Sequence, residues 1–175
     1  GIPGTELPLA VARHATSKIH DGDDLEKIAT LGFRGEALAA IAAVSRVEMV
    51  TCQQSAAEAT RILIDHGKLV TVEAASRAPG TTVSVQGLFR GIPARRKFLK
   101  TPQTELDHLV KTITRIALAR PEVAFRVRQQ GKVLLSAAGG TDLDQRVRSI
   151  LEPRGRSGAL VHVERVAGEY SLQAW

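Results

Sequence analysis

The chain has 175 residues, of which 43% are hydrophobic and 24% charged, with a formal net charge of +6. This length suits one ordinary domain, or one domain and part of a second, with a sizeable core. A single cysteine, Cys52, excludes a disulfide framework and a cysteine-based zinc cluster. No apolar run approaches the roughly 18–20 residues that span a bilayer, so we expect no membrane partner. The positive charge permits an anionic partner without identifying it.

The first part of the chain predicts short helices and antiparallel strands. The apolar spacing within 5–15 is typical of the end of a helix, and Asp23 or Asp24 can cap a short helix after the polar loop that follows. Glu36–Val44 predicts a buried, alanine-rich helix. Strands are expected, in order, at 46–51, 60–65, 68–73 and 81–89, with turns at His66-Gly67 and Pro79-Gly80.

The second part predicts one long helix and further hairpins. Pro102 occupies a first-turn position and Thr101 can cap, so the spacing predicts a helix over 102–119. The later elements expected are a hairpin of 122–128 with 131–136, a helix at 142–151, and strands near 159–166 and 169–174. Gly139-Gly140 is the best candidate domain boundary. This mixture favours an α+β sandwich over a doubly wound parallel sheet.

Two segments could face a phosphate group. RHATSKI, residues 13–19, places Thr16, Ser17 and Lys18 in a loop just after a helix, and the alternative is a helix end with a solvated lysine. GFRGEAL, residues 32–38, has two glycines three residues apart before a helix, which lets the backbone approach an anion. The alternative there is a tight turn with Phe33 packed inward. No Walker A sequence follows Gly35.

A third pair of segments carries a hydroxyl and a cluster of cations. Thr81 follows the Pro79-Gly80 turn and could present its hydroxyl to a polar ligand or a water molecule. PARRKFLK, residues 93–100, holds four cations within six residues. Arg96 and Lys100 are four residues apart and would share a helix face that could contact nucleic acid, while Phe98 and Leu99 would point partly inward. The alternatives are a solvated helix start, or Arg95 or Arg96 paired with a carboxylate of the same domain.

Together, RHATSKI, GFRGEAL, GTT and PARRKFLK resemble the amino-terminal ATPase region of MutL-type DNA mismatch repair proteins. The resemblance covers residues 1 to about 140 and, more weakly, the remainder. It implies a two-layer α/β sandwich of the gyrase, Hsp90 and histidine kinase type, which is incomplete here. It also implies two domains. Residues 1–140 would form part of the ATP-binding domain, containing the lid and the phosphate half of the site. Residues 141–175 would begin a second domain that resembles domain 2 of ribosomal protein S5.

The resemblance also implies roles for individual residues. Gly1 and Ile2 resemble the end of an Asp-x-Gly-x-Gly-Ile motif at the adenine, and Thr81 would support adenine recognition, partly through water. Thr16, Ser17 and Lys18 would lie in the lid near the phosphates. The segment that would wrap the triphosphate consists of Gly32, Phe33, Arg34, Gly35, Glu36, Ala37 and Leu38.

The family's remaining machinery is expected outside this sequence. The general-base glutamate, the asparagine that binds Mg²⁺ and the adenine-reading aspartate would precede Gly1, and a γ-phosphate lysine would follow Trp175. The chain is therefore expected to be a fragment that does not hydrolyse ATP alone. The longer protein is expected to be cytoplasmic and to form a homodimer. Its expected partners are ATP with Mg²⁺, DNA, a mismatch-recognition protein and a downstream nuclease or helicase. A non-enzymatic, basic nucleic-acid-binding module is the alternative.

Overall fold

The computed structural model describes residues 1–12, 15, 35–152, 162–167 and 170–174. Backbone contacts divide the chain into two compact units, Gly1–Leu99 and Lys100–Trp175. This division differs from the predicted division into domains of residues 1–140 and 141–175, which stays a prediction. No helix in the described part of the chain is long and apolar enough to cross a bilayer.

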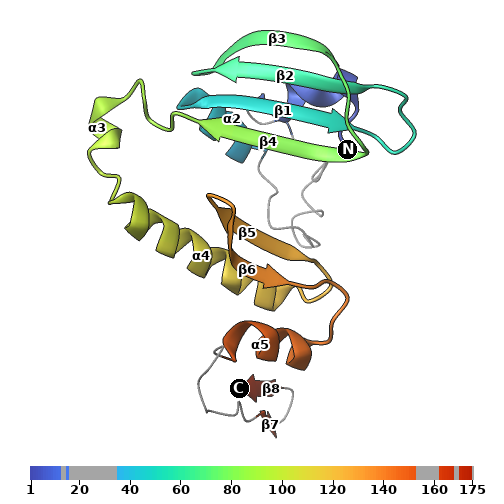
Figure 1. Cartoon of the computed structure of the whole chain (residues 1–175), viewed down its shortest axis with the longest axis vertical. Helices are drawn as coiled ribbons and strands as arrows, with labels where there is room; N and C mark the ends of the chain where they lie inside the picture. Colours follow the sequence, from blue (N-terminus) through green and yellow to red (C-terminus); the bar gives the residue numbers. More distant parts are fainter. Residues whose placement is uncertain (13–14, 16–34, 153–161, 168–169, 175) are drawn as a thin grey trace. The chain divides into compact units, whose positions relative to one another are not determined.

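The first unit contains a four-stranded antiparallel sheet (Figure 1). Its strands are β1 (Arg46–Cys52), β2 (Ala59–Asp65), β3 (Lys68–Ala75) and β4 (Gly80–Gln86), in the spatial order β3-β2-β1-β4. These bounds confirm the predicted strands. However, β4 ends three residues earlier than predicted, because Gly87 and Phe89 adopt φ of 62° and 60°, which extended backbone does not allow.

A two-residue turn joins β2 to β3, as predicted. His66 and Gly67 have φ of 47° and 81°. Positive φ at both central residues matches the right-handed twist of a hairpin, and only glycine adopts it without a steric cost. The turn therefore fixes the register at the adjoining end of the hairpin, where Ile64 lies opposite Leu69, and the register shifts by one residue between Leu63 and Ile64.

Short helices cover one face of this sheet and complete the two layers. They are the 3-10 helix η1 (Gly4–Glu6), α1 (Leu7–Ala10) and α2 (Ala37–Ala43). Leu7 and Ala42 on the helices pack against strand residues that point to the same face because side chains alternate along a strand. The buried cluster comprises Leu7, Ala42, Val47, Met49, Ile62 and Ile64. The expected α+β sandwich is therefore present, and α2 confirms the predicted helix over residues 36–44.

The basic segment after β4 differs from its prediction. The helix α3 spans only Pro93–Arg96, and Lys97 and Phe98 form a turn beyond it. Phe98 is 81% exposed, so the prediction that it points inward is wrong. The prediction that Arg96 and Lys100 share a helix face is also wrong, because the helix ends at Arg96 and the two residues belong to different compact units.

The second unit begins with the long helix α4 (Pro102–Ala119). Thr101 caps it by accepting a hydrogen bond from the Thr104 backbone N–H at 3.3 Å, as predicted. The later elements are β5 (Phe125–Gln129), β6 (Lys132–Ala137), α5 (Leu143–Leu151), β7 (Val163–Ala167) and β8 (Tyr170–Ala174). The strands pair as the hairpins β5–β6 and β7–β8.

Arg146 on α5 anchors this helix to the β5–β6 hairpin and to the end of α4. Its side chain is fully buried. One guanidinium nitrogen, Nη2, donates to the carbonyl oxygens of Pro121, Val123 and Ala138 at 2.7, 2.7 and 2.5 Å. Pro121, Val123 and Ala138 lie outside the strands, so their carbonyls have no strand partner and accept from Arg146 instead.

Candidate functional site

The Thr51 hydroxyl connects three segments at one end of the sheet. Thr51 lies near the end of β1, directly opposite Thr81 on β4, and is only 1% exposed. The Ile2 backbone N–H donates to Thr51 Oγ1 at 2.7 Å, and the Thr51 and Thr81 hydroxyl oxygens lie 2.8 Å apart. Thr51 Oγ1 also lies 3.3 Å from the Gly80 carbonyl oxygen and donates to it. The two predicted adenine-side positions, Gly1-Ile2 and Thr81, therefore meet around one buried hydroxyl.

This network leaves acceptor capacity on the Thr81 hydroxyl oxygen. A hydroxyl carries one proton, so when Thr51 donates to Gly80, Thr81 donates to Thr51. The Thr81 oxygen then keeps lone pairs that can accept a hydrogen bond, and the residue is exposed. An amino group or a water molecule is the chemical partner that such an acceptor suits.

Gly1 lies so close to the end of β1 that no side chain fits there. A Cβ atom at this position would lie 2.0 Å from the Cys52 carbonyl oxygen and 2.8 Å from the Gln53 backbone nitrogen. Backbone atoms cannot move aside as a flexible side chain can. The close approach therefore explains why glycine precedes Ile2, and it brings the Ile2 N–H to Thr51.

Gly35 connects the two predicted phosphate-facing segments. It has φ of +63°, and a Cβ there would lie 2.1 Å from the carbonyl oxygen of Ala15, which directly precedes Thr16. Both facts confirm that this glycine is required by its backbone conformation and its close approach. Glu36 forms the N-cap of α2, Ala37 begins the helix, and Leu38 packs against the core cluster. Thr16, Ser17, Lys18, Gly32, Phe33 and Arg34 lie outside the described residues.

Sequence reasoning missed Thr51. Its strand was predicted, but a threonine in a strand gives no local signal of a polar role. The signal is the pairing of β1 with β4, which sets Thr51 opposite the threonine that follows Pro79-Gly80. Among the described residues, no group of three or more histidine, cysteine, aspartate or glutamate side chains is arranged to hold a metal ion.

The proposed nucleic-acid contacts are not joined in one site. Arg96 and Lys100 are exposed, and neither side chain forms an ion pair with another described residue. Arg95 instead lies over the Phe89 ring, with 5.9 Å between its guanidinium carbon and the ring centroid. The alternative pairing of Arg95 or Arg96 with a carboxylate is therefore not found within the described ranges.

Known proteins similar to this chain are mismatch repair proteins. A DNA mismatch repair protein MutL of Xanthomonas oryzae pv. oryzae is 53% identical over 132 residues, which cover 75% of this chain and 21% of that protein. The MutL of Thiobacillus denitrificans is 43% identical over 175 residues, or 100% of this chain and 29% of that protein. The chain belongs to the MutL family. No family model matches it.

Solved structures place the MutL likeness in the ATPase region. The Aquifex aeolicus MutL ATPase domain complexed with ADP has a TM-score of 0.67 at 28% identity, covering 84% of this chain and 56% of that one. The N-terminal domain of a DNA repair protein has a TM-score of 0.71 at 26% identity, covering 94% of this chain and 48% of that one. The chain thus spans 21–29% of the length of the curated MutL relatives described above.

Proposed function

We propose that this chain forms part of the nucleotide site of a longer, cytoplasmic MutL protein that binds and hydrolyses ATP. The observation that carries the proposal is the Thr51 network, which joins Ile2 to Thr81 at one end of the sheet. The exposed Thr81 hydroxyl would accept a hydrogen bond from the adenine amino group, directly or through water. A related ATPase domain has been solved with ADP.

The turn at Gly35 would serve the phosphate end of the same nucleotide. Gly35 approaches Ala15 so closely that a Cβ there would lie 2.1 Å from the Ala15 carbonyl oxygen, which brings together one residue from each of the two segments. In this proposal, backbone N–H groups of residues 32–38 and the groups of Thr16, Ser17 and Lys18 surround the triphosphate. The described residues offer no cluster of acidic ligands for Mg²⁺, so the ion would depend on ligands from other residues.

ATP would act in this proposal as a conformational switch. Binding would order the lid, favour a homodimer of the amino-terminal regions, and couple a mismatch-recognition protein on DNA to a downstream nuclease or helicase. A nucleotide shifts such an equilibrium only through its different affinity for the two states, so the lid contacts at Gly35 must be better in the closed state.

The test is nucleotide affinity in the full-length protein. Thr81→Val removes the proposed acceptor while keeping the side-chain shape, and it should weaken ADP binding about fivefold, the value of one neutral hydrogen bond of ~1 kcal/mol. Thr82→Val is the matched control, because successive residues of β4 point to opposite faces and the Thr82 hydroxyl binds Arg77 at 2.8 Å. Equal ADP affinity in the two variants, measured by calorimetry, would contradict the assignment.

The alternative function is that of a basic module that binds nucleic acid without using a nucleotide. Measuring DNA affinity with and without ATP distinguishes it from the ATPase proposal. Its DNA affinity would fall with salt and would be the same with and without ATP. Under the ATPase proposal, ATP changes the DNA affinity of the full-length protein.

A further inference from the structure

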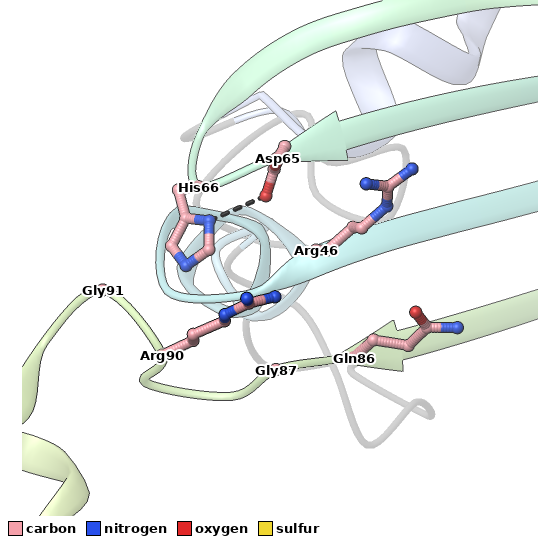
Figure 2. A pocket seen from close by; sticks show the side chains of 7 residues that line it. All are labelled: Arg46, Asp65, His66, Gln86, Gly87, Arg90 and Gly91. Carbon is pink, nitrogen blue, oxygen red and sulfur yellow. Dashed lines mark hydrogen bonds and ion pairs between the residues drawn. The ribbon is translucent and has the colours of Figure 1, made fainter.

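A cavity lies at the other end of the sheet from Thr51. It has a volume of about 410 Å³ and is formed where β1 begins, where β2 turns into β3 and where the chain leaves β4 (Figure 2). An adjoining hollow of about 310 Å³ shares three side chains with it, those of Arg46, Gln86 and Arg90. Volumes of roughly 300–1,000 Å³ are typical of small-ligand pockets.

The two arginines of this cavity are not held by a carboxylate at contact distance in the described part of the chain, although Arg46 attracts Glu48 from further away. Arg46 and Arg90 are exposed, and neither side chain has an ion pair or hydrogen bond to another residue that the structure describes. Figure 2 shows the Arg90 side chain extending from its loop toward the beginning of β1, where Arg46 lies. Gln86 lies nearby at the end of β4. Two guanidinium groups and one amide therefore supply a surplus of hydrogen-bond donors.

The acidic groups nearby are already engaged. Asp65 Oδ1 lies 2.7 Å from His66 Nδ1, and Glu48 Oε2 lies 2.5 Å from Arg61 Nη2. The hydrogen bond from Arg61 holds the pKa of Glu48 below its usual value, so this carboxylate stays paired with Arg61. His66 Nε2 has no hydrogen-bond partner among the described residues, although its ring lines the cavity. The remaining charge of the cavity is positive.

We propose that Arg46, Gln86 and Arg90 form a binding site for a phosphate group, separate from the proposed nucleotide site. Guanidinium groups bind phosphate oxygens through paired, charge-assisted hydrogen bonds, and a neutral amide adds a further donor. The seven residues of β1 extend about 20 Å at roughly 3.3 Å per residue, so one phosphate cannot contact both ends. The group can belong to a nucleic-acid backbone or to a free phosphate compound, and these share the same recognition chemistry.

The test compares two double variants of the 175-residue chain that lose equal charge. Arg46→Gln with Arg90→Gln alters the site. Arg126→Gln with Arg128→Gln alters two exposed arginines of β5 in the other compact unit. Inorganic pyrophosphate binding is measured by calorimetry, and binding of a 20-base-pair duplex is measured by fluorescence anisotropy at several salt concentrations. Thermal unfolding followed by circular dichroism establishes that each variant is folded.

The site variant should bind at least one probe about tenfold more weakly than the unaltered chain, whereas the β5 variant should not. If duplex affinity is lost, the salt slope should also fall by up to about two, because each phosphate contact contributes about 0.9. A selective loss for the duplex identifies a nucleic-acid backbone, and a selective loss for pyrophosphate identifies a free phosphate compound.

A third variant tests the site even if the double variant does not fold. Gln86→Leu removes the amide donors without changing the charge and should weaken the same probe by a smaller factor. No binding of either probe to the unaltered chain, or equal losses in the two double variants, overturns the proposal. The measurement with the duplex rests on the proposed repair function, whereas the measurement with pyrophosphate does not. If the Thr81 experiment contradicts the proposed function, the pyrophosphate measurement still tests the phosphate site.

Discussion

At the scale of single residues, Arg146 carries a buried charge that is solvated by backbone carbonyls. Its guanidinium replaces lost water with the carbonyls of Pro121, Val123 and Ala138, and its carbon lies 6.0 Å from the centroid of the Phe125 ring. Carbonyl dipoles and an aromatic face both stabilise a cation. Arg146 therefore stabilises the packing of α5 against the β5–β6 hairpin.

Replacing Arg146 by methionine should destabilise the chain by about 3 kcal/mol, because the carbonyls of Pro121, Val123 and Ala138 lose their charged donor. Arg148→Met, two residues along α5, is the control. Arg148 is partly exposed and pairs with Asp144 and Glu152, and such surface pairs contribute about 0–1 kcal/mol. Urea unfolding measures the free energy of unfolding of both variants. A similar loss in the two variants would show that Arg146 has no special role in the packing of α5.

Gly35→Ala should weaken nucleotide binding in the full-length protein and reduce nucleotide-driven dimerisation. The substitution imposes the cost of a left-handed conformation, about 1–2 kcal/mol, and also forces the new Cβ against the Ala15 carbonyl. Gly131→Ala imposes the first cost alone, since Gly131 has φ of +82° and nothing lies within 4 Å of its Cβ position. Calorimetric titration with ADP should separate them. Equal affinity in both variants would falsify the role of the Ala15 contact.

At the scale of elements, a row of charges crosses the outer face of three strands. Arg61 on β2 bonds to Glu48 on β1 and to Glu73 on β3. The row joins neighbouring strands on the face away from the helices. Its stability contribution depends on pH because the Arg61 hydrogen bond to Glu48 joins two opposite charges only while Glu48 is ionised.

The stabilisation by Glu48 should be lost in acid. Its pKa in the folded chain is lowered, chiefly by the Arg61 hydrogen bond, below the unfolded value of about 4.3. A lowered pKa gives stability that is fully present above the unfolded value and declines as pH falls through the folded value. Glu48→Gln should therefore reduce the free energy of unfolding at pH 7 and have a diminishing effect below about pH 4. In an Arg61→Gln background this pH dependence should become much smaller, because only the weaker attraction of Arg46 then lowers the pKa of Glu48, and urea unfolding at several pH values can check this.

Local patterns predicted most elements correctly. The helix over residues 102–119 has a proline in its first turn and a capping threonine, so residues adjacent in the sequence are enough to predict where it begins. His66-Gly67 and Gln130-Gly131 likewise mark turns that their own backbone requires. Thr51 and Phe98 could not be assigned in this way. The role of Thr51 depends on its pairing with Thr81, which is 30 residues away in the sequence. The exposure of Phe98 depends on a helix that ends after one turn, at Arg96.

At the scale of the whole molecule, the two compact units meet in the sequence at Leu99 and Lys100. Residues 93–100 are exposed throughout. The glycines of the predicted boundary are instead tied to the second unit. A Cβ at Gly139 would lie 2.9 Å from the Ala124 nitrogen, and the Gly140 N–H donates to the Glu122 carbonyl at 3.2 Å.

Brief digestion with proteinase K should therefore cut residues 97–101 before it cuts Gly139-Gly140. A protease needs several residues of accessible, deformable backbone. Residues 97–101 supply this, whereas Gly139 is held close to the backbone of residues 122–124 and Gly140 is hydrogen-bonded to Glu122. Mass spectrometry of the first products decides the order. Earlier cleavage at Gly139-Gly140 would favour the division into 1–140 and 141–175.

The spatial order β3-β2-β1-β4 has a kinetic consequence. Three of the strands are neighbours in sequence and can pair as local hairpins, but β4 must return to β1 across two intervening strands. Loop closure costs more as the separation grows, so the Cys52–Gly80 end of this pair should zip before the Arg46–Gln86 end. Pulse-labelling hydrogen exchange during refolding should protect β2 and β3 first and the Gln86 end of β4 last. The phosphate cavity would then be the last part of the sheet to assemble, after the Thr51 end has already set the strand register.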